Sequence, residues 1–152
     1  MGDATFSLEE AQRSLAVLSN NEAWRLLGRS LRVVEDDSRM LSAAIASDYL
    51  WNLVGTAANR QRGAWLLARV HAELGDAAGA MRHAEACAAL TETHANDMAP
   101  FDFAYACEAL ARAFRLAGDT DAADRHLAEA ERLGNEILDE EDRDIFFADL
   151  RA

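Results

Sequence analysis

The sequence contains one helical pattern twice, and this repetition limits the folds that the chain can adopt. Residues 74–90 (LGDAAGAMRHAEACAAL) and 117–133 (AGDTDAADRHLAEAERL) align with Gly75 on Gly118, an offset of 43 residues. Small residues recur five and twelve places after each glycine: Ala80 and Cys87 in the first copy, Ala123 and Ala130 in the second. Small side chains at a helical spacing let two antiparallel helices approach closely, so the pattern predicts stacked helical hairpins.

The Gly-Asp pairs mark the turns of these hairpins. Each glycine follows the last apolar residue of a helix and must reverse the chain at once, so we expect positive φ at Gly75 and Gly118. Asp76 and Asp119 then begin the following helices. The short connections leave no room for a crossover, which predicts that the joined helices are antiparallel.

The whole chain is expected to be helical. It has one proline, Pro100, and few alternating β-branched runs, and its abundant alanine favours helices over strands. Ser7 and Glu10 have the spacing of a capping box. We expect breaks at 20–21 and 36–38 and a loop at 94–100. The all-α fold is therefore predicted to have seven or eight helices, over about 7–18, 21–34, 39–55, 59–74, 76–93, 101–117, 120 into the 130s, and 139–151.

Residues 24–31 (WRLLGRSL) match the W-x2-L-G pattern that opens a tetratricopeptide repeat. With the two Gly-Asp turns, this segment resembles that repeat family. The resemblance implies one domain over residues 1–152, with a degenerate repeat at about 21–54, repeats at about 59–93 and 101–134, and a capping helix at about 139–151. The chain is also similar to a group of small bacterial proteins of this class in residues 51–56 (WNLVGT), 59–65 (NRQRGAW), 102–113 (DFAYACEALARA) and 139–143 (DEEDR). That group supplies no activity.

Charge and motifs argue against several classes of function. The net charge of −12 would repel nucleic acid phosphates. No apolar stretch reaches the roughly 20 residues of a membrane span, and the first ten residues lack the features of a secretory signal, so we expect a cytoplasmic protein. No nucleophile elbow, phosphate-binding loop or zinc-protease motif is present, so we expect neither enzymatic activity nor a cofactor. His83 and Cys87 lie four residues apart, but no further ligand has the spacing of a metal site.

In tetratricopeptide arrays the first helix of each hairpin lines a concave face, where ligands usually bind. Residues at i, i+3, i+7 and i+10 share one side of a helix. On that side the predicted helices place the candidate ligand-binding residues Arg25 and Arg29, then Arg62, Trp65 and Arg69, then Tyr105, Glu108 and Arg112. Arginine binds carboxylates through a planar fork, which predicts a groove for an acidic ligand. Alternatively, these arginines merely cover exposed helix faces and pair with nearby Asp and Glu.

The leading hypothesis is an adaptor that binds an acidic peptide or protein segment in this groove. The alternative is a helical domain that senses or acts on a small anionic metabolite there. An open channel favours the peptide, whereas a pocket closed by the first or last helix, with buried arginines and His71 or Trp65 at its base, favours the metabolite. The acidic run at 136–149 is expected to be the solvated face of the capping helix, whose apolar residues pack on the preceding helix. Contact with a partner or a second copy, as in a homodimer, stays open for those residues.

Overall fold

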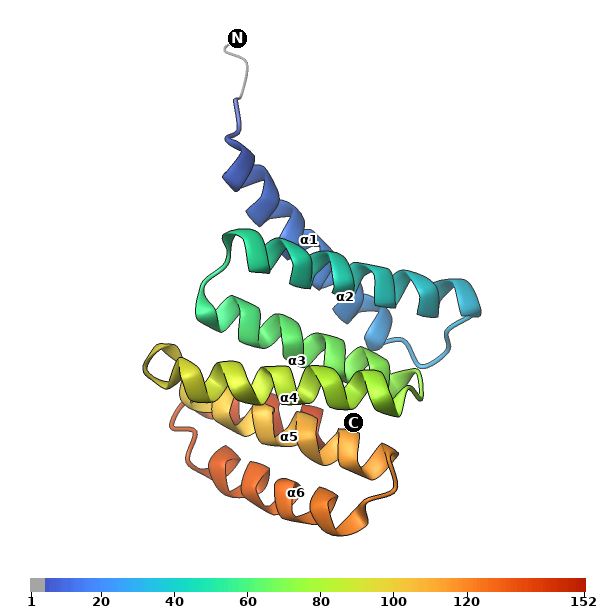
Figure 1. Ribbon diagram of the computed structural model, residues 1–152, viewed down its shortest axis with the longest axis vertical. Coiled ribbons are helices and arrows are strands. Elements are labelled where there is room, and N and C mark those ends of the chain that lie inside the picture. Colours follow the sequence, from blue (N-terminus) through green and yellow to red (C-terminus); the bar gives the residue numbers. More distant parts are fainter. Residues whose placement is uncertain (1–4) are drawn as a thin grey trace.

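The computed structural model describes residues 5–152, and these residues form an all-α structure without strands. The helices are α1 (Leu8–Leu27), α2 (Val34–Val54), α3 (Ala57–Glu73), α4 (Ala77–Thr93), α5 (Pro100–Leu116), α6 (Thr120–Asn135) and α7 (Glu140–Arg151), with a short 3-10 helix at Ala95–Asp97. Figure 1 shows them as successive hairpins: α1 with α2, α3 with α4, and α5 with α6. The predicted all-α fold of helical hairpins is confirmed. None of the described helices combines the length and apolar character needed to cross a membrane.

The two Gly-Asp turns have the predicted geometry. Gly75 has φ 77° and Gly118 has φ 88°, and no other described residue has positive φ. At the first turn the amide of Asp76 donates to the carbonyl of His71 at 2.9 Å, and the amide of Gly75 donates to that of Ala72 at 3.1 Å. This bonding pattern ends a helix through a left-handed glycine. The second turn repeats it one hairpin later.

The N-terminal hairpin differs from the prediction. Residues 20–21 do not break the first helix, because α1 runs without interruption from Leu8 to Leu27. Ala16 and Ala23 are both fully buried, and their separation of seven residues keeps one face of α1 against the rest of the structure. The low helix propensity of two asparagines is outweighed by this packing. The first hairpin therefore starts near residue 8 rather than near residue 21.

The second predicted break is also wrong. Asp36, Asp37 and Ser38 lie in the first turns of α2, which begins at Val34. The amide of Val33 donates to Asp36 Oδ2 at 3.3 Å, so the acidic residues begin this helix instead of ending the previous one. Negative charge is favourable at this end because of the helix dipole.

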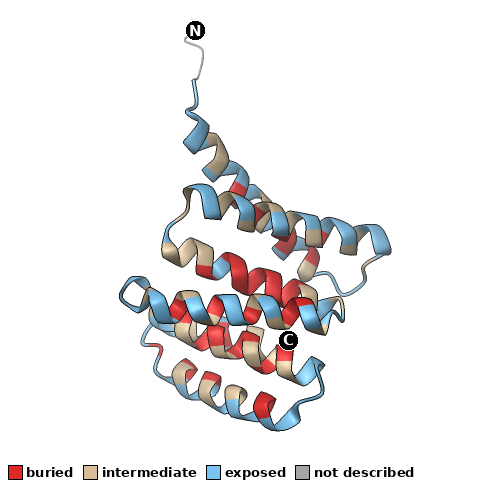
Figure 2. Cartoon of the chain, in the orientation of Figure 1, coloured by how far each residue is buried: buried red, intermediate tan, exposed pale blue. Residues whose placement is uncertain are grey.

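Burial is greatest on α3 and α5, as Figure 2 shows. Every residue from Gly63 to Val70 of α3 is buried, which marks α3 as a central helix surrounded by its neighbours. The predicted small packing positions are also buried: Ala80, Cys87, Ala123 and Ala130 are each 0% exposed. Burial raises the pKa of the Cys87 thiol to about 12, so this cysteine is an unreactive packing residue.

The last helix packs against α5 and α6 and is partly hidden behind α4 and α5 in Figure 1. Phe146 is 0% exposed and lies against Gly134 of α6, where an added Cβ would come within 2.5 Å of the phenylalanine ring. Glycine at this position leaves room for the ring. The expectation that the apolar face of the capping helix packs on the preceding helix is confirmed.

Candidate functional site

A row of aromatic side chains joins the odd-numbered helices on one face of the molecule. Trp24 of α1 stacks on Trp65 of α3 with ring centroids 5.3 Å apart. Trp65 meets Tyr105 of α5 edge to face at 5.0 Å, and Tyr105 meets Phe146 of α7 in the same way at 5.0 Å. The four residues define what we call the aromatic face. It has two parts, which differ in how far α7 covers them.

The first part is the arginine cluster, formed by Arg69 of α3 with Glu108 and Arg112 of α5. Arg112 Nε donates to Glu108 Oε1 at 2.7 Å, and Arg69 Nη1 lies 3.6 Å from the same oxygen. The other oxygen, Glu108 Oε2, accepts a hydrogen bond from Trp65 Nε1 at 2.7 Å. Glu108 is 2% exposed and Arg69 is 7% exposed. One buried carboxylate thus serves two guanidinium groups and an indole.

The terminal nitrogens of both arginines bind the end of α7, whereas Arg69 Nε is buried without a hydrogen-bond partner among the described residues. Arg69 and Arg112 each donate to the backbone carbonyls of Asp149 and Ala152, over distances of 3.2 to 3.4 Å. The last carbonyls of a helix have no partner within the helix, and cationic side chains are favourable there. Tyr105 Oη also donates to Asp149 Oδ2 at 2.5 Å. The arginine cluster therefore fixes α7 across the aromatic face.

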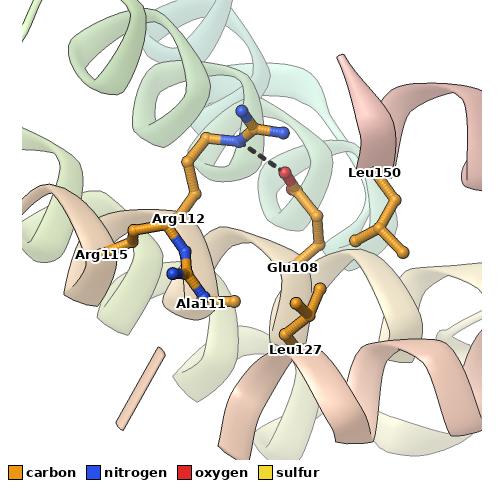
Figure 3. Close-up of a pocket in the computed structure, with 6 residues that line it drawn as sticks. All are labelled: Glu108, Ala111, Arg112, Arg115, Leu127 and Leu150. Atoms are coloured by element: carbon orange, nitrogen blue, oxygen red, sulfur yellow. Dashed lines mark hydrogen bonds and ion pairs between the residues drawn. The ribbon is translucent and has the colours of Figure 1, made fainter. Parts of the chain in front are cut away.

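Two cavities border Arg112, one of about 290 Å³ toward Glu73 and Leu116 and a smaller one toward α7. A cavity of about 150 Å³ lies between Glu108, Arg112 and Leu150 of α7. In Figure 3 the Glu108–Arg112 bond spans the upper part of this cavity, and Leu150 lies on the other side of Glu108. Burial and the neighbouring charge of Arg112 lower the pKa of Arg69. The group still carries its charge at neutral pH because an arginine pKa starts above 12.

The second part is the aromatic pocket, a cavity of about 390 Å³ between α1, α3, α5 and α7. Its walls include Trp24, Trp65, Phe101 and Tyr105, and its polar residues include Gln61 and Arg62. Ile145 and Asp149 of α7 border one side. The volume lies in the range of small-ligand sites, which are typically apolar with a few placed polar groups.

Arg62 lies at the rim of the aromatic pocket. Its Nε and Nη2 donate to the two carboxylate oxygens of Asp102 at 2.9 and 3.0 Å. This fork raises the pKa of Arg62. The guanidinium also lies 4.9 Å from the centre of the Phe101 ring. Its Nη1 has no hydrogen-bond partner among the described residues, and 47% of the side chain is exposed, so one cationic donor remains available.

Gln61 borders the same pocket and carries a buried acceptor. Its Nε2 donates to Thr91 Oγ1 and to the carbonyl of Asp102, both at 3.0 Å. These two bonds use both amide hydrogens and fix the orientation of the side chain. Gln61 Oε1 has no hydrogen-bond partner among the described residues, although the residue is 0% exposed. A buried oxygen without a donor is unfavourable and uncommon.

The structure brings together six of the eight predicted ligand-binding residues. Arg62, Trp65, Arg69, Tyr105, Glu108 and Arg112 all belong to the arginine cluster, the aromatic pocket or both. Arg25 and Arg29 form no hydrogen bond or ion pair with these six. Arg25 pairs with Glu22 on the exposed surface, and Arg29 lies beyond the end of α1 and pairs with Asp36.

The misplacement of Arg25 and Arg29 follows from the helix boundary. A helix that begins at residue 21 and continues past residue 27 would place both arginines on this face, but α1 begins at Leu8 and ends at Leu27. Trp24 holds the place on the aromatic face that was assigned to Arg25. The sequence does show Trp24 in the repeat signature, and this was the signal that could have identified it.

Sequence reasoning also missed the acidic partners. Asp102 lies one helical turn before Tyr105, the residue of α5 that is equivalent to Arg62 of α3. That register could have suggested the Arg62–Asp102 pair. Nothing in the spacing of α7 indicates that its last carbonyls reach Arg69, because this contact depends on the angle at which α7 crosses the face.

Metal ligands are not gathered in the described part of the chain. Among residues 5–152, no group of three or more His, Cys, Asp or Glu side chains has a metal-binding arrangement. His83 stacks instead on His71, with ring centroids 5.1 Å apart, and His71 Nδ1 lies 2.9 Å from Asp76 Oδ2.

Comparisons with known proteins add no family to this geometry. The sequence has no match among protein-family models, and neither curated proteins nor solved structures give a significant match.

Proposed function

We propose that the protein is an interaction module that binds an acidic segment of another protein on its aromatic face. One observation carries the proposal: the pocket on this face stays open beside α7, with apolar walls and the unused Nη1 of Arg62 at its rim. Apolar walls supply affinity, and a partly exposed guanidinium selects an acceptor such as a carboxylate.

The contacts of α7 support an acidic partner. Five of its twelve residues are acidic: Glu140, Glu141, Asp142, Asp144 and Asp149. Its last carbonyls accept hydrogen bonds from Arg69 and Arg112, while the ring of Phe146 is buried. An acidic helix with an aromatic anchor therefore already lies on this face. A partner segment of similar chemistry has the adjoining pocket available to it.

The arginines do not all serve the partner. Arg69 and Arg112 are occupied by Glu108 and α7, so their role is to hold α7 in place. Among the predicted arginines, Arg62 lines the pocket. Its Nη1 also has no partner among the described residues. We therefore assign recognition of the acidic group to Arg62 and not to the arginine cluster.

Selection of short random peptides displayed on phage tests this function. Enriched peptides should carry Asp or Glu beside a bulky apolar residue, and their affinity should fall as salt rises, because Arg62 is partly exposed. The double variant Arg62→Gln with Asp102→Asn removes both charges and keeps hydrogen-bonding groups at both positions. The double variant should bind the enriched peptides about tenfold more weakly. Arg125→Gln on the exposed surface of α6 should not change their affinity. Failure to enrich any peptide, or enrichment of basic peptides, would overturn the proposal.

A small anionic metabolite is a second candidate, supported by the burial of Trp65 and Arg69 next to a cavity that α7 borders. Thermal shift measurements with a panel of small aromatic carboxylates separate the two candidates. Stabilisation of the wild type by a carboxylate, lost in the Arg62→Gln/Asp102→Asn variant, would favour the metabolite. Peptide binding without any carboxylate response would favour the interaction module.

A further inference from the structure

We infer, building on the proposed function, that the aromatic pocket receives a tryptophan side chain from the acidic segment and that Gln61 Oε1 accepts its indole N–H. The pocket lies between aromatic rings of three helices, Trp24, Trp65, Phe101 and Tyr105, and a volume of about 390 Å³ leaves room for a two-ring side chain. Aromatic side chains meet one another favourably in edge-to-face or offset arrangements.

The polar chemistry of the pocket selects among aromatic side chains. Gln61 Oε1 is buried without a donor. The amide keeps this orientation because both of its hydrogens are bonded elsewhere. Phenylalanine brings no donor. Tyrosine brings a donor and also an oxygen that needs partners of its own, whereas the indole is a donor only. Tryptophan therefore satisfies the buried oxygen without adding another unsatisfied group.

A cationic occupant fits less well, although aromatic walls attract cations in general. Arg62 places a positive charge at the rim. Asp102 is paired with Arg62, and Asp149 accepts a hydrogen bond from Tyr105. A lysine or arginine in the pocket would meet the like charge of Arg62, whose partner Asp102 is already bound on both oxygens. The same charge at Arg62 favours acidic residues beside the tryptophan.

Four fluorescein-labelled peptides of equal length test the inference by fluorescence anisotropy. The central residue is either tryptophan or 3-benzothienylalanine, which has the shape of tryptophan with sulfur in place of the N–H. The flanking residues are either Glu and Asp or the neutral Gln and Asn. We expect tryptophan to bind about tenfold more tightly than benzothienylalanine with either set of flanks, because the analogue leaves Gln61 Oε1 unpaired. Acidic flanks should bind more tightly than neutral flanks, and only this difference should shrink as salt rises.

The four affinities separate the two proposals. Equal affinity of the tryptophan and benzothienylalanine peptides would overturn the tryptophan assignment and leave the acidic-segment function standing. A tryptophan preference without any effect of the flanks would support the pocket assignment and contradict the acidic partner. No binding by any peptide would contradict both.

The Gln61→Met variant provides a second test on the protein side. Methionine has a similar length but no amide oxygen, so the variant should lose the tenfold preference for tryptophan. If Gln61→Met does not fold, the side-chain amide signals of Gln61 in the wild type can be followed by NMR instead. The tryptophan peptide should shift these signals more than the benzothienylalanine peptide, and equal shifts would contradict the inferred hydrogen bond.

Discussion

The arginine cluster and the aromatic pocket lie side by side on one face, share Trp65, and differ in how far α7 covers them. In the cluster, Glu108 accepts from Arg112 and Trp65, and the carbonyls of α7 accept most of the remaining arginine donors. In the pocket, Gln61 Oε1 has no partner among the described residues. Bonds to α7 cover the cluster, where Arg69 Nε is also buried without a partner among the described residues. The unpaired oxygen of Gln61 instead belongs to a residue that borders an open cavity, and an unsatisfied buried group beside a cavity is a feature of sites that bind something else.

The comparison shows why a count of arginines on one face overstates a binding site. Five of the predicted ligand-binding residues are arginines, yet two of them hold α7 and two others pair on the surface of the N-terminal hairpin. Arg62 differs from them because its ion pair leaves one donor at the rim of a cavity. An unused donor counts toward binding only where it lies beside an open cavity, because Arg69 Nε also has no partner among the described residues but is buried.

Glu108→Gln should have the largest effect on stability. The change removes the carboxylate that lies against two guanidinium groups and leaves a buried charge without compensation, so the free energy of unfolding should fall by about 3–5 kcal/mol. Urea unfolding measures this free energy. Glu129→Gln, in an exposed pair with Arg132, is a matched control that should not shift the midpoint of the urea transition. A loss below about 1 kcal/mol in Glu108→Gln would show that the cluster is not a buried network.

Phe146→Ala should separate the attachment of α7 from the rest of the fold. Removing a ring that is 0% exposed should lower the free energy of unfolding by about 3 kcal/mol or more. Hydrogen exchange should then accelerate in α7 while α3 and α5 keep their protection. Ile145→Ala, on the same helix at a side chain that is 51% exposed, should leave the exchange of α7 unchanged. Equal effects of the two substitutions would contradict the assigned packing.

Trp24→Ala tests the pocket with a smaller effect on the fold. Trp24 is 37% exposed, so its loss should lower stability by only about 1 kcal/mol. It also forms a wall of the pocket, so the affinity for the tryptophan-containing acidic peptide should fall about tenfold. Leu18→Ala, an exposed apolar position on the same helix, should leave peptide binding intact. A Trp24→Ala variant that binds normally would place the ligand elsewhere.

Arg25→Ala should have the smallest effect of the series. The side chain is 53% exposed and pairs only with Glu22 on its own helix, so neither the melting temperature nor peptide affinity should change measurably. A clear loss of peptide affinity in Arg25→Ala would restore this residue to the binding site and contradict the register that the structure gives α1.

The sequence predicts the C-terminal hairpins more accurately than the N-terminal one, for a local physical reason. At Gly75 and Gly118 the turn needs a left-handed conformation that glycine adopts without strain, so the residue type identifies the turn. At residues 20–21 the two asparagines only weaken a helix, and burial of Ala16 and Ala23 decides the outcome. Local signals that require a conformation are reliable, whereas signals that merely disfavour one are not.

The same distinction applies to the site. Helical spacing predicts that Trp65 and Arg69 share one side of α3 and that Tyr105 and Arg112 share one side of α5. This prediction is reliable because the helix itself fixes the positions of residues four or seven places apart. The partners of these side chains are set by how helices cross. The contact between Arg69 and the carbonyl of Asp149 joins residues far apart in the chain, and the unpaired oxygen of Gln61 depends on the positions of Thr91 and Asp102. Such relations need the tertiary structure.

NMR titration of the isotopically labelled protein with the tryptophan-containing acidic peptide compares the two parts of the face in one measurement. We predict that the side-chain amide of Gln61, the indole N–H of Trp24 and the Nε–H of Arg62 shift on binding, while the Nε–H signals of Arg69 and Arg112 stay in place. The opposite pattern, with shifts at Arg69, Arg112 and α7 and none at Gln61, would mean that the peptide displaces α7 from the arginine cluster and that the aromatic pocket is not the binding site.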